Sequence, residues 1–203
     1  MDLYYHEVSA PARKACATAT YLNTPVNFKR IDLAKGEQQS ADYLAINPNG
    51  KVPTLRDGDK TIWESNAIMC YLANKAGSDI WPKDERQIDI VRWFCWETAH
   101  FSRHASTLIF ENAIRSQVGM GEPKQEAIEE AQGFFERFAG VLNDHLKGKD
   151  YLVGDALTVA DFAVASTLPN AHLGKFSLDG VPEVKRWYAG LSELPAWKEP
   201  FPS

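Results

Sequence analysis

Residues 47–65 read NPNGKVPTLRDGDKTIWES, and this stretch indicates the fold of the segments around it. A turn signal at Asn47–Gly50 comes first, and two short β-prone runs follow, KVPTL at 51–55 and KTIWES at 60–65. Between them lies Asp57-Gly58, a dipeptide typical of tight hairpin turns. The stretch therefore predicts two antiparallel strands joined by a hairpin.

The segments on both sides extend this hairpin into a small α/β domain. Upstream, the patterns predict a strand at 3–5, a helix at 11–22, a strand at 26–33 and a short helix at 41–46. Downstream, a helix over 64–75 is expected to end at Gly77. Because a helix joins the first two strands, they should run parallel, with a right-handed crossover. The order βαβαββα predicts a mixed four-stranded sheet with helices on its faces.

Beyond residue 83 the sequence carries helical patterns and no clear strand. Long helices are expected at 84–109 and from the break at Gly119–Pro123 to about residue 146. Thr158 should begin another helix, because Asp161 three residues later completes a capping-box pattern. We therefore expect an α/β domain at 1–77, a linker at 78–83 and an all-helical domain at 84–203.

Composition narrows the classes of function. The chain has 203 residues and a net charge of −5 without a basic tract, which argues against a nucleic-acid partner. The N-terminus lacks a signal-peptide pattern, and no apolar run approaches the roughly 20 residues that span a bilayer. The odd number of cysteines, Cys16, Cys70 and Cys95, predicts reduced, buried thiols in a cytoplasmic protein.

Two junctions carry candidate site residues. In HEVSAPARKA at 6–15, Ser9 stands before a helix, where it can cap the helix or help to hold an anion. Glu64 and Ser65 stand where a strand gives way to a helix. Ser65 can cap that helix while its first amides face a ligand carboxylate, and Glu64 can meet an ammonium; capping alone explains both residues equally well.

The Val52–Pro53 bond is a third candidate. If it is cis, the backbone amide and carbonyl beside it point outward and can pair with an extended, peptide-like ligand. Because cis is the minority state of bonds to proline, the residues alone favour trans. A proline at a strand start then explains the position.

The helical part offers weaker signals. His100 and His104 are spaced for a shared metal ion, but no third ligand or HExxH pattern accompanies them, so we expect a cleft-lining or solvent role. An aromatic stripe predicts core or a subunit interface; it consists of Trp93, Phe94, Trp96 and Phe101.

Together the motifs resemble those of a cytosolic glutathione S-transferase. The likeness runs through LYYHEVSAPARKA, RIDLAKGEQQSADYLAINPNGKVPTLRDGD, TIWESNAIMCYLANK and DYLVGDALTVADF, and is strongest over 1–77 and near 150–165. The resemblance implies a thioredoxin-like domain that binds glutathione, a helical domain that binds an electrophile, a homodimer and no metal. Ser9 lies four residues before Arg13, as in theta-like, serine-type, bacterial-style members, whereas tyrosine-type members have tyrosine where this chain has Glu7.

The resemblance also implies residue roles. Ser9 would donate a hydrogen bond to the glutathione sulfur and favour the thiolate, with Tyr5 and His6 as the next candidates, although a plain N-cap fits the same geometry. The glutathione-binding residues implied are Gln38 (with Gln39 as its alternative), Lys51, Val52, the cis-proline Pro53, Glu64 and Ser65. The electrophile site is expected along one side of the first long helix, at His100, Phe101, His104 and Leu108.

The sequence thus predicts an enzyme that adds the glutathione thiolate to a small hydrophobic electrophile. Two alternatives remain open: glutathione-dependent reduction of disulfides or peroxides, and a non-catalytic interaction protein with the same fold.

Overall fold

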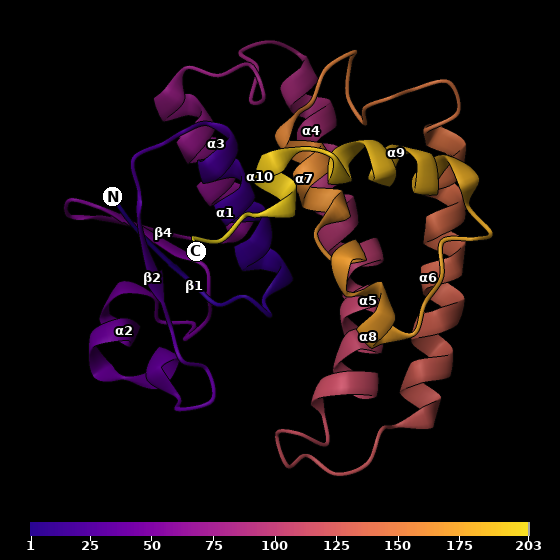
Figure 1. Ribbon diagram of the computed structural model, residues 1–203, viewed down its shortest axis with the longest axis horizontal. Helices are drawn as coiled ribbons and strands as arrows, with labels where there is room; N and C mark the ends of the chain where they lie inside the picture. Colours follow the sequence, from indigo (N-terminus) through magenta and orange to yellow (C-terminus); the bar gives the residue numbers. More distant parts are fainter. Residues whose placement is uncertain (203) are drawn as a thin grey trace. The chain divides into compact units, whose positions relative to one another are not determined.

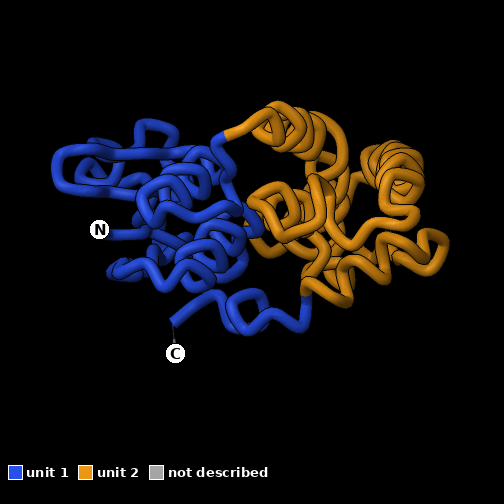
Figure 2. The backbone as a smooth tube through the Cα atoms, turned by 90° about the horizontal axis from the view of Figure 1, so that it is seen from above, with its two compact units in different colours: residues 1–83, 192–203 blue, residues 84–191 orange. Residues whose placement is uncertain are grey.

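The computed structural model describes residues 1–202, which form two compact units. Unit 1 comprises residues 1–83 together with the C-terminal segment from Ser192 on, drawn in blue in Figure 2. Unit 2 comprises residues 84–191, drawn in orange. The segment after Ser192, expected as part of the helical domain at 84–203, packs within unit 1 in the structure.

Unit 1 contains the predicted mixed sheet, with strand order β2-β1-β3-β4. β1 and β2 are parallel, and β3 is antiparallel to both β1 and β4. Asp57 pairs with Lys60, so the two-residue loop is Gly58-Asp59, one position later than the predicted Asp57-Gly58 turn. The strands are β1 (Asp2–Tyr5), β2 (Asn27–Arg30), β3 (Thr54–Asp57) and β4 (Lys60–Trp63).

The two faces of this sheet are covered differently (Figure 1). α1 (Ala10–Tyr21) and α3 (Ser65–Ala76) pack on the face that presents Leu3 and Leu55, and both leucines are fully buried. α2 (Ala41–Ile46) lies against the other face, where Tyr43 meets Tyr4 edge to face at 5.7 Å between ring centroids. The alternation of side chains along β1 therefore separates the main core from the α2 side. Gly77 ends α3 in the left-handed conformation, as predicted.

Unit 2 is built from helices. Residues 86–114 follow one helical path. A π-helical turn at Glu97–Phe101 interrupts it where the sequence predicted a regular helix, and a second π turn, at Phe110–Ile114, continues it beyond the predicted end at 109. A π turn accommodates an extra residue and shifts the side chains that follow around the helix axis. The helices of this unit are α4 (Arg86–Trp96), α5 (Ser102–Ile109), α6 (Gln125–His145), α7 (Val159–Ala165), α8 (Ala171–Gly174) and α9 (Pro182–Ser192).

The predicted helix start at Thr158 is confirmed, with Asp161 fully buried behind it. One carboxylate oxygen of Asp161 accepts from the Leu152 amide and the Trp187 indole N–H, both at 3.0 Å. The other oxygen accepts from the Thr158 amide at 2.9 Å and its hydroxyl at 3.1 Å. Asp161 thus completes the cap of α7 and also ties the preceding loop and α9 to this helix.

The cysteines differ from one another. Cys16 is buried in the core of unit 1 and Cys70 is partly buried, while Cys95 on α4 is exposed, so the prediction of three buried thiols is wrong for Cys95. Burial raises the pKa of Cys70 to about 12. None of the helices within residues 1–202 combines the length and the hydrophobicity that a membrane-spanning helix needs.

We predict that Asp161→Asn lowers the free energy of unfolding by about 3 kcal/mol, because an amide NH₂ would face two of the four donors. Urea denaturation measures this change. Asp155→Asn in the preceding exposed loop is the matched control and should change stability by less than about 0.5 kcal/mol. Equal effects of the two substitutions would contradict the role given to Asp161.

Candidate active site

The register of the sheet gathers four chain segments at one of its ends. Tyr4, Thr54 and Trp63 are aligned across β1, β3 and β4, so the chain leaves β1 and β4 and enters β3 at the same end. β2 ends there too, because Tyr5 pairs with Arg30. Neighbouring strands lie about 4.8 Å apart. Four residues of the predicted site lie within two positions of these strand ends in the chain, namely Val52, Pro53, Glu64 and Ser65, and Ser9 follows the end of β1 by four residues.

Ser9 is the N-cap of α1. Its Oγ accepts a hydrogen bond from the Ala12 amide at 3.2 Å, and its own amide donates to the His6 carbonyl at 3.0 Å. The capping role that the sequence left open is therefore present. A hydroxyl that accepts through oxygen keeps its proton for donation, so capping and donation to a ligand are compatible at Ser9.

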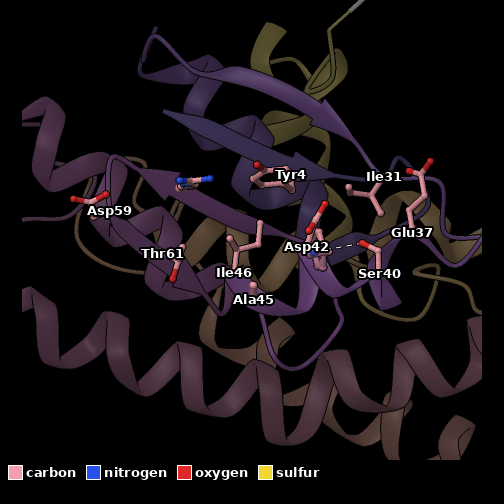
Figure 3. A pocket seen from close by; sticks show the side chains of 11 residues that line it. Tyr4, Ile31, Glu37, Ser40, Asp42, Ala45, Ile46, Asp59 and Thr61 are labelled. Carbon is pink, nitrogen blue, oxygen red and sulfur yellow. Dashed lines mark hydrogen bonds between the residues drawn. The ribbon is translucent and has the colours of Figure 1, made fainter.

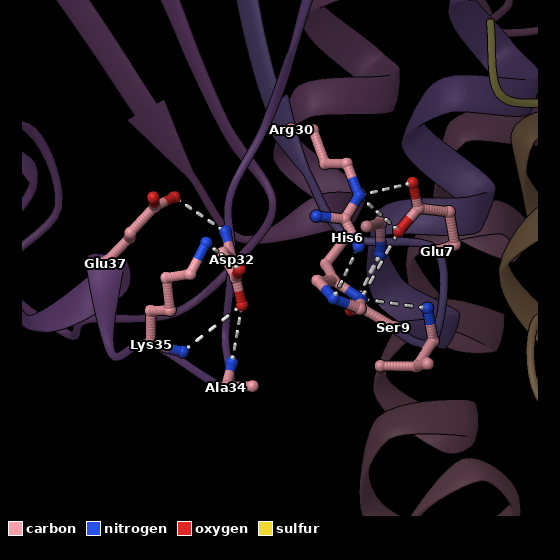
Figure 4. Close-up of polar contacts among 10 residues, drawn as sticks. His6, Glu7, Ser9, Arg30, Asp32, Ala34, Lys35 and Glu37 are labelled. Atoms are coloured by element: carbon pink, nitrogen blue, oxygen red, sulfur yellow. Dashed lines mark hydrogen bonds and ion pairs between the residues drawn. The ribbon is translucent and has the colours of Figure 1, made fainter. Parts of the chain in front are cut away.

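An ionic network fixes the loop between β1 and Ser9 (Figure 4). Arg30 donates from Nε to both carboxylate oxygens of Glu7, at 2.9 and 3.1 Å. His6 accepts through Nδ1 from the Val8 amide at 3.2 Å, and its Nε2 lies 3.4 Å from Arg30. Burial alone would raise the pKa of Glu7, but backbone and Arg30 hydrogen bonds outweigh it and lower the pKa. No sequence pattern predicts this network, because Arg30 and Glu7 lie 23 residues apart in the chain.

The two residues ranked after Ser9 are engaged elsewhere. The ring of Tyr5 is buried against Phe28 and Phe201 in the core of unit 1, and burial raises the pKa of its hydroxyl. The imidazole of His6 is held by the loop network described above. This geometry favours Ser9 among the three.

The Val52–Pro53 bond is cis, so the trans preference derived from the residues alone is wrong. The adjoining backbone is anchored by buried polar side chains: the Lys51 carbonyl accepts from the Tyr43 hydroxyl and the Asn47 amide, both at 2.8 Å. Within residues 1–202, the hydrogen bonds of the turn before β3 are made by Lys51 and Thr54. None of them involves the backbone amide or carbonyl of Val52.

Glu64, and not Ser65, is the N-cap of α3, which corrects the sequence prediction. Glu64 has φ 69° and ψ 112°, and its side chain makes no capping bond. A residue other than glycine in this region costs about 1–3 kcal/mol, and such strain clusters at functional sites. Ser65 is the first helical residue, so its amide belongs to the electropositive end of α3.

The remaining residues of the predicted glutathione site lie in the loop before α2 and in the turn before β3. The Lys51 side chain is exposed. Gln39 donates from Nε2 to the Gly50 carbonyl at 3.3 Å and so joins the loop to the turn. Gln38 donates to the Leu33 carbonyl at 3.5 Å, while its Oε1 is buried without a partner among the described residues.

The predicted electrophile residues do not share one environment. Phe101 and Leu108 are 0 % and 1 % exposed, and Phe101 stacks on Phe135 at 5.1 Å, so both belong to the core of unit 2. That corrects the expectation that they line a site.

The rings of His100 and His104 stack at 4.7 Å on two phenylalanines of α6, Phe138 and Phe134 respectively. Burial lowers the pKa of His104. No group of three metal-ligating side chains occurs within residues 1–202.

A separate groove of about 830 Å³ lies on the α2 side of the sheet (Figure 3). Tyr4, Tyr43 and Ile46 line it together with Arg56 and Thr61. None of the residues of the predicted glutathione site lines this groove. The two features are therefore distinct parts of unit 1.

The fold and the site define a class. A thioredoxin-like domain with a four-stranded mixed sheet, followed by a helical domain, is the architecture of glutathione S-transferases. The model of the glutathione S-transferase N-terminal domain matches residues 2–74, and that of the C-terminal domain matches residues 98–195. The chain belongs to the glutathione S-transferase family.

Solved structures agree with this assignment. A glutathione S-transferase-I bound with lactoylglutathione is 26% identical, with 98% of this chain and 97% of that chain covered and a TM-score of 0.88. A glutathione S-transferase from Pseudomonas fluorescens is 26% identical, with 96% of each chain covered and a TM-score of 0.86. The transferase URE2P8 from Phanerochaete chrysosporium, solved with oxidized glutathione, is 25% identical, with 98% and 92% covered and a TM-score of 0.86.

We predict that Gly50→Ala destabilises the protein by about 1 kcal/mol more than Gly58→Ala. Both glycines have positive φ, so both substitutions carry the same backbone strain. A Cβ at Gly50 would lie 2.5 Å from Gln39 Nε2 and 3.1 Å from the Gln38 carbonyl, whereas one at Gly58 meets nothing within 4 Å. Denaturant unfolding of the two variants measures the difference, and equal losses would contradict the close approach.

Proposed function

We propose that the protein is a glutathione transferase that adds the glutathione thiolate to a small hydrophobic electrophile. The observation that carries the proposal is Ser9, which caps α1 through Oγ in the family's glutathione domain while its hydroxyl proton stays available. Glutathione is the co-substrate, and no metal ion takes part in the proposed reaction.

The proposed chemistry follows from the thiol. A free thiol has a pKa of about 8.5 and is mostly protonated at neutral pH. A hydrogen bond from Ser9 and the positive end of α1 both favour the anion. The thiolate then forms the S–C bond to the electrophile, while the displaced group leaves with its electron pair or, in an addition, the adjacent atom takes a proton. Ser9 stabilises the nucleophile and forms no covalent bond.

The rest of glutathione would be held by the other segments at the same sheet end. The backbone of Val52, preceding Pro53, pairs with the cysteinyl part. Glu64 meets the γ-glutamyl ammonium, and the amide of Ser65 at the start of α3 meets its carboxylate. Lys51 and Gln38 face the glycyl carboxylate, and the Gln38 NH₂ gives up its long hydrogen bond to the Leu33 carbonyl to donate there.

Three finer features belong to the same proposal. The electrophile is expected to contact His100 and His104. Their rings stack on phenylalanine partners and form an aromatic surface with them. The spacing of Ser9 and Arg13 supports the theta-like, serine-type subclass. We also propose a homodimer that acts in detoxification in the cytoplasm, where three cysteines that form no disulfide stay reduced.

The test compares wild type, Ser9→Ala and Glu64→Gln by calorimetric titration with glutathione and by ultraviolet absorbance of the bound thiolate. Ser9→Ala should raise the pKa of the bound thiol by about one unit, worth roughly 1.4 kcal/mol, with little loss of affinity. At a pH below the wild-type thiol pKa, kcat then falls about tenfold. Glu64→Gln should weaken binding about tenfold, because it removes the charge that faces the ammonium.

Ser40→Ala is the matched control, since Ser40 caps α2 in the same way, accepting from the Tyr43 amide at 3.3 Å. Both serine variants should lose about 1 kcal/mol of stability, but only Ser9→Ala should move the thiol pKa. Absence of glutathione binding at millimolar concentration would refute the enzyme assignment. Turnover of glutathione disulfide without conjugation would replace it by the reductase alternative.

A further inference from the structure

The C-terminal segment packs on the elements that flank the Ser9 loop. Within unit 1, Phe201 stacks on Tyr5 at 5.4 Å between centroids and 15° between planes. The Thr20 hydroxyl donates to the Pro200 carbonyl at 3.4 Å near the end of α1. Trp197, in the short helix α10 (Pro195–Lys198), is 1 % exposed. We call residues 195–201 the C-terminal strap.

Arg13, near the start of α1, contacts the strap through its guanidinium group. Its Nη2 donates to the Trp197 carbonyl at 2.5 Å. Its guanidinium lies over the rings of Trp197 and Phe201, at 5.3 and 6.0 Å from their centroids. A cation near a helix N-terminus is unfavourable by about 0.3–1 kcal/mol, and the carbonyl and the two ring faces offset that cost.

These contacts bracket the loop that carries Ser9. Tyr5 is the last residue of β1, directly before the loop, and Arg13 is the fourth residue of α1, which begins directly after the loop. The Arg13 amide also donates to the Ser9 carbonyl at 2.9 Å, so a shift of Arg13 moves the backbone of Ser9. Phe201 touches both flanking residues, through the Tyr5 ring and the Arg13 guanidinium.

We propose that the C-terminal strap positions Ser9 for the glutathione sulfur, with Phe201 and Arg13 as the positioning residues that clamp both ends of the loop. The proposal rests on the transferase function proposed above. A hydroxyl displaced by about 1 Å loses much of its hydrogen bond to the sulfur, and misplacement of that size can cost up to about 100-fold in rate. The strap therefore acts on the reaction through Ser9 without touching glutathione.

Two measurements on the full chain test the proposal, and the first needs no ligand. Hydrogen exchange of the Ser9 and Arg13 amides should be at least tenfold faster in Phe201→Ala than in wild type, since the clamp on the loop is lost. Phe201→Tyr keeps the ring and should restore wild-type rates. Lys147→Gln breaks an exposed ion pair to Asp144 in unit 2, outside the strap, and should leave these rates unchanged.

The second measurement is kcat and KM for glutathione with a reactive aromatic chloride, together with the thiolate absorbance. Phe201→Ala and Arg13→Lys should lower kcat about tenfold and reduce thiolate absorbance at constant KM. Arg13→Lys keeps the charge but loses the planar fork and its stacking. In a Ser9→Ala background, Phe201→Ala should have no further effect on kcat, because the hydroxyl that it positions is absent.

The outcomes separate this proposal from the one on which it rests. If wild type forms no glutathione thiolate, the transferase function fails and the role of the strap in catalysis fails with it. If wild type forms the thiolate and folded Phe201→Ala matches it in exchange rates and kcat, only the strap proposal is overturned. If Arg13→Lys has the kcat and thiolate absorbance of wild type, the positive charge at residue 13 suffices, and the positioning role proposed for the Arg13 guanidinium is wrong.

Discussion

The candidate site depends on the central place of β3, which pairs antiparallel with β1 on one side and β4 on the other. This register aligns Tyr4, Thr54 and Trp63, and so brings the exit of β1, the entry to β3 and the exit of β4 to one end of the sheet. A one-residue slip would turn every side chain of β3 to the opposite face and expose Leu55, which is fully buried. The hydrophobic core and the site are therefore specified by the same pairing.

Buried polar networks then fix the loops that the sheet brings together. Asn47, Tyr43 and Thr54 satisfy one another and the Lys51 carbonyl, so the turn beside Pro53 is held without burying an unpaired group. Arg30 and Glu7 hold the loop before Ser9. In unit 2, Asp161 plays the same part for the loop before α7. Rigid loops position donors before a ligand arrives, which is a requirement for stabilising a developing charge.

Features determined by neighbours in the chain were predictable from the sequence, and features determined by distant partners were not. The hairpin at Gly58, the cap at Thr158 and the end of α3 at Gly77 depend on residues a few positions apart. The Arg30–Glu7 pair spans 23 residues and the Arg13–Trp197 contact spans 184, so neither can be predicted from a local sequence pattern. The positive φ of Glu64 and the cis bond before Pro53 are imposed by surrounding structure against local preference. The π turn at 97–101 likewise shifts the side chains that follow it around the helix axis, so a regular helical repeat does not predict where they lie.

We propose above that one end of the sheet in unit 1 holds glutathione, with its sulfur at Ser9. The most direct measurement is a titration of isotope-labelled protein with glutathione, followed by backbone amide chemical shifts. Binding at this end of the sheet predicts concerted, saturable shifts at Ser9, Val52 and Ser65 and none along the α2 groove at Ile46 and Thr61. Shifts confined to the groove or to unit 2, with these three amides unchanged at saturation, would contradict it.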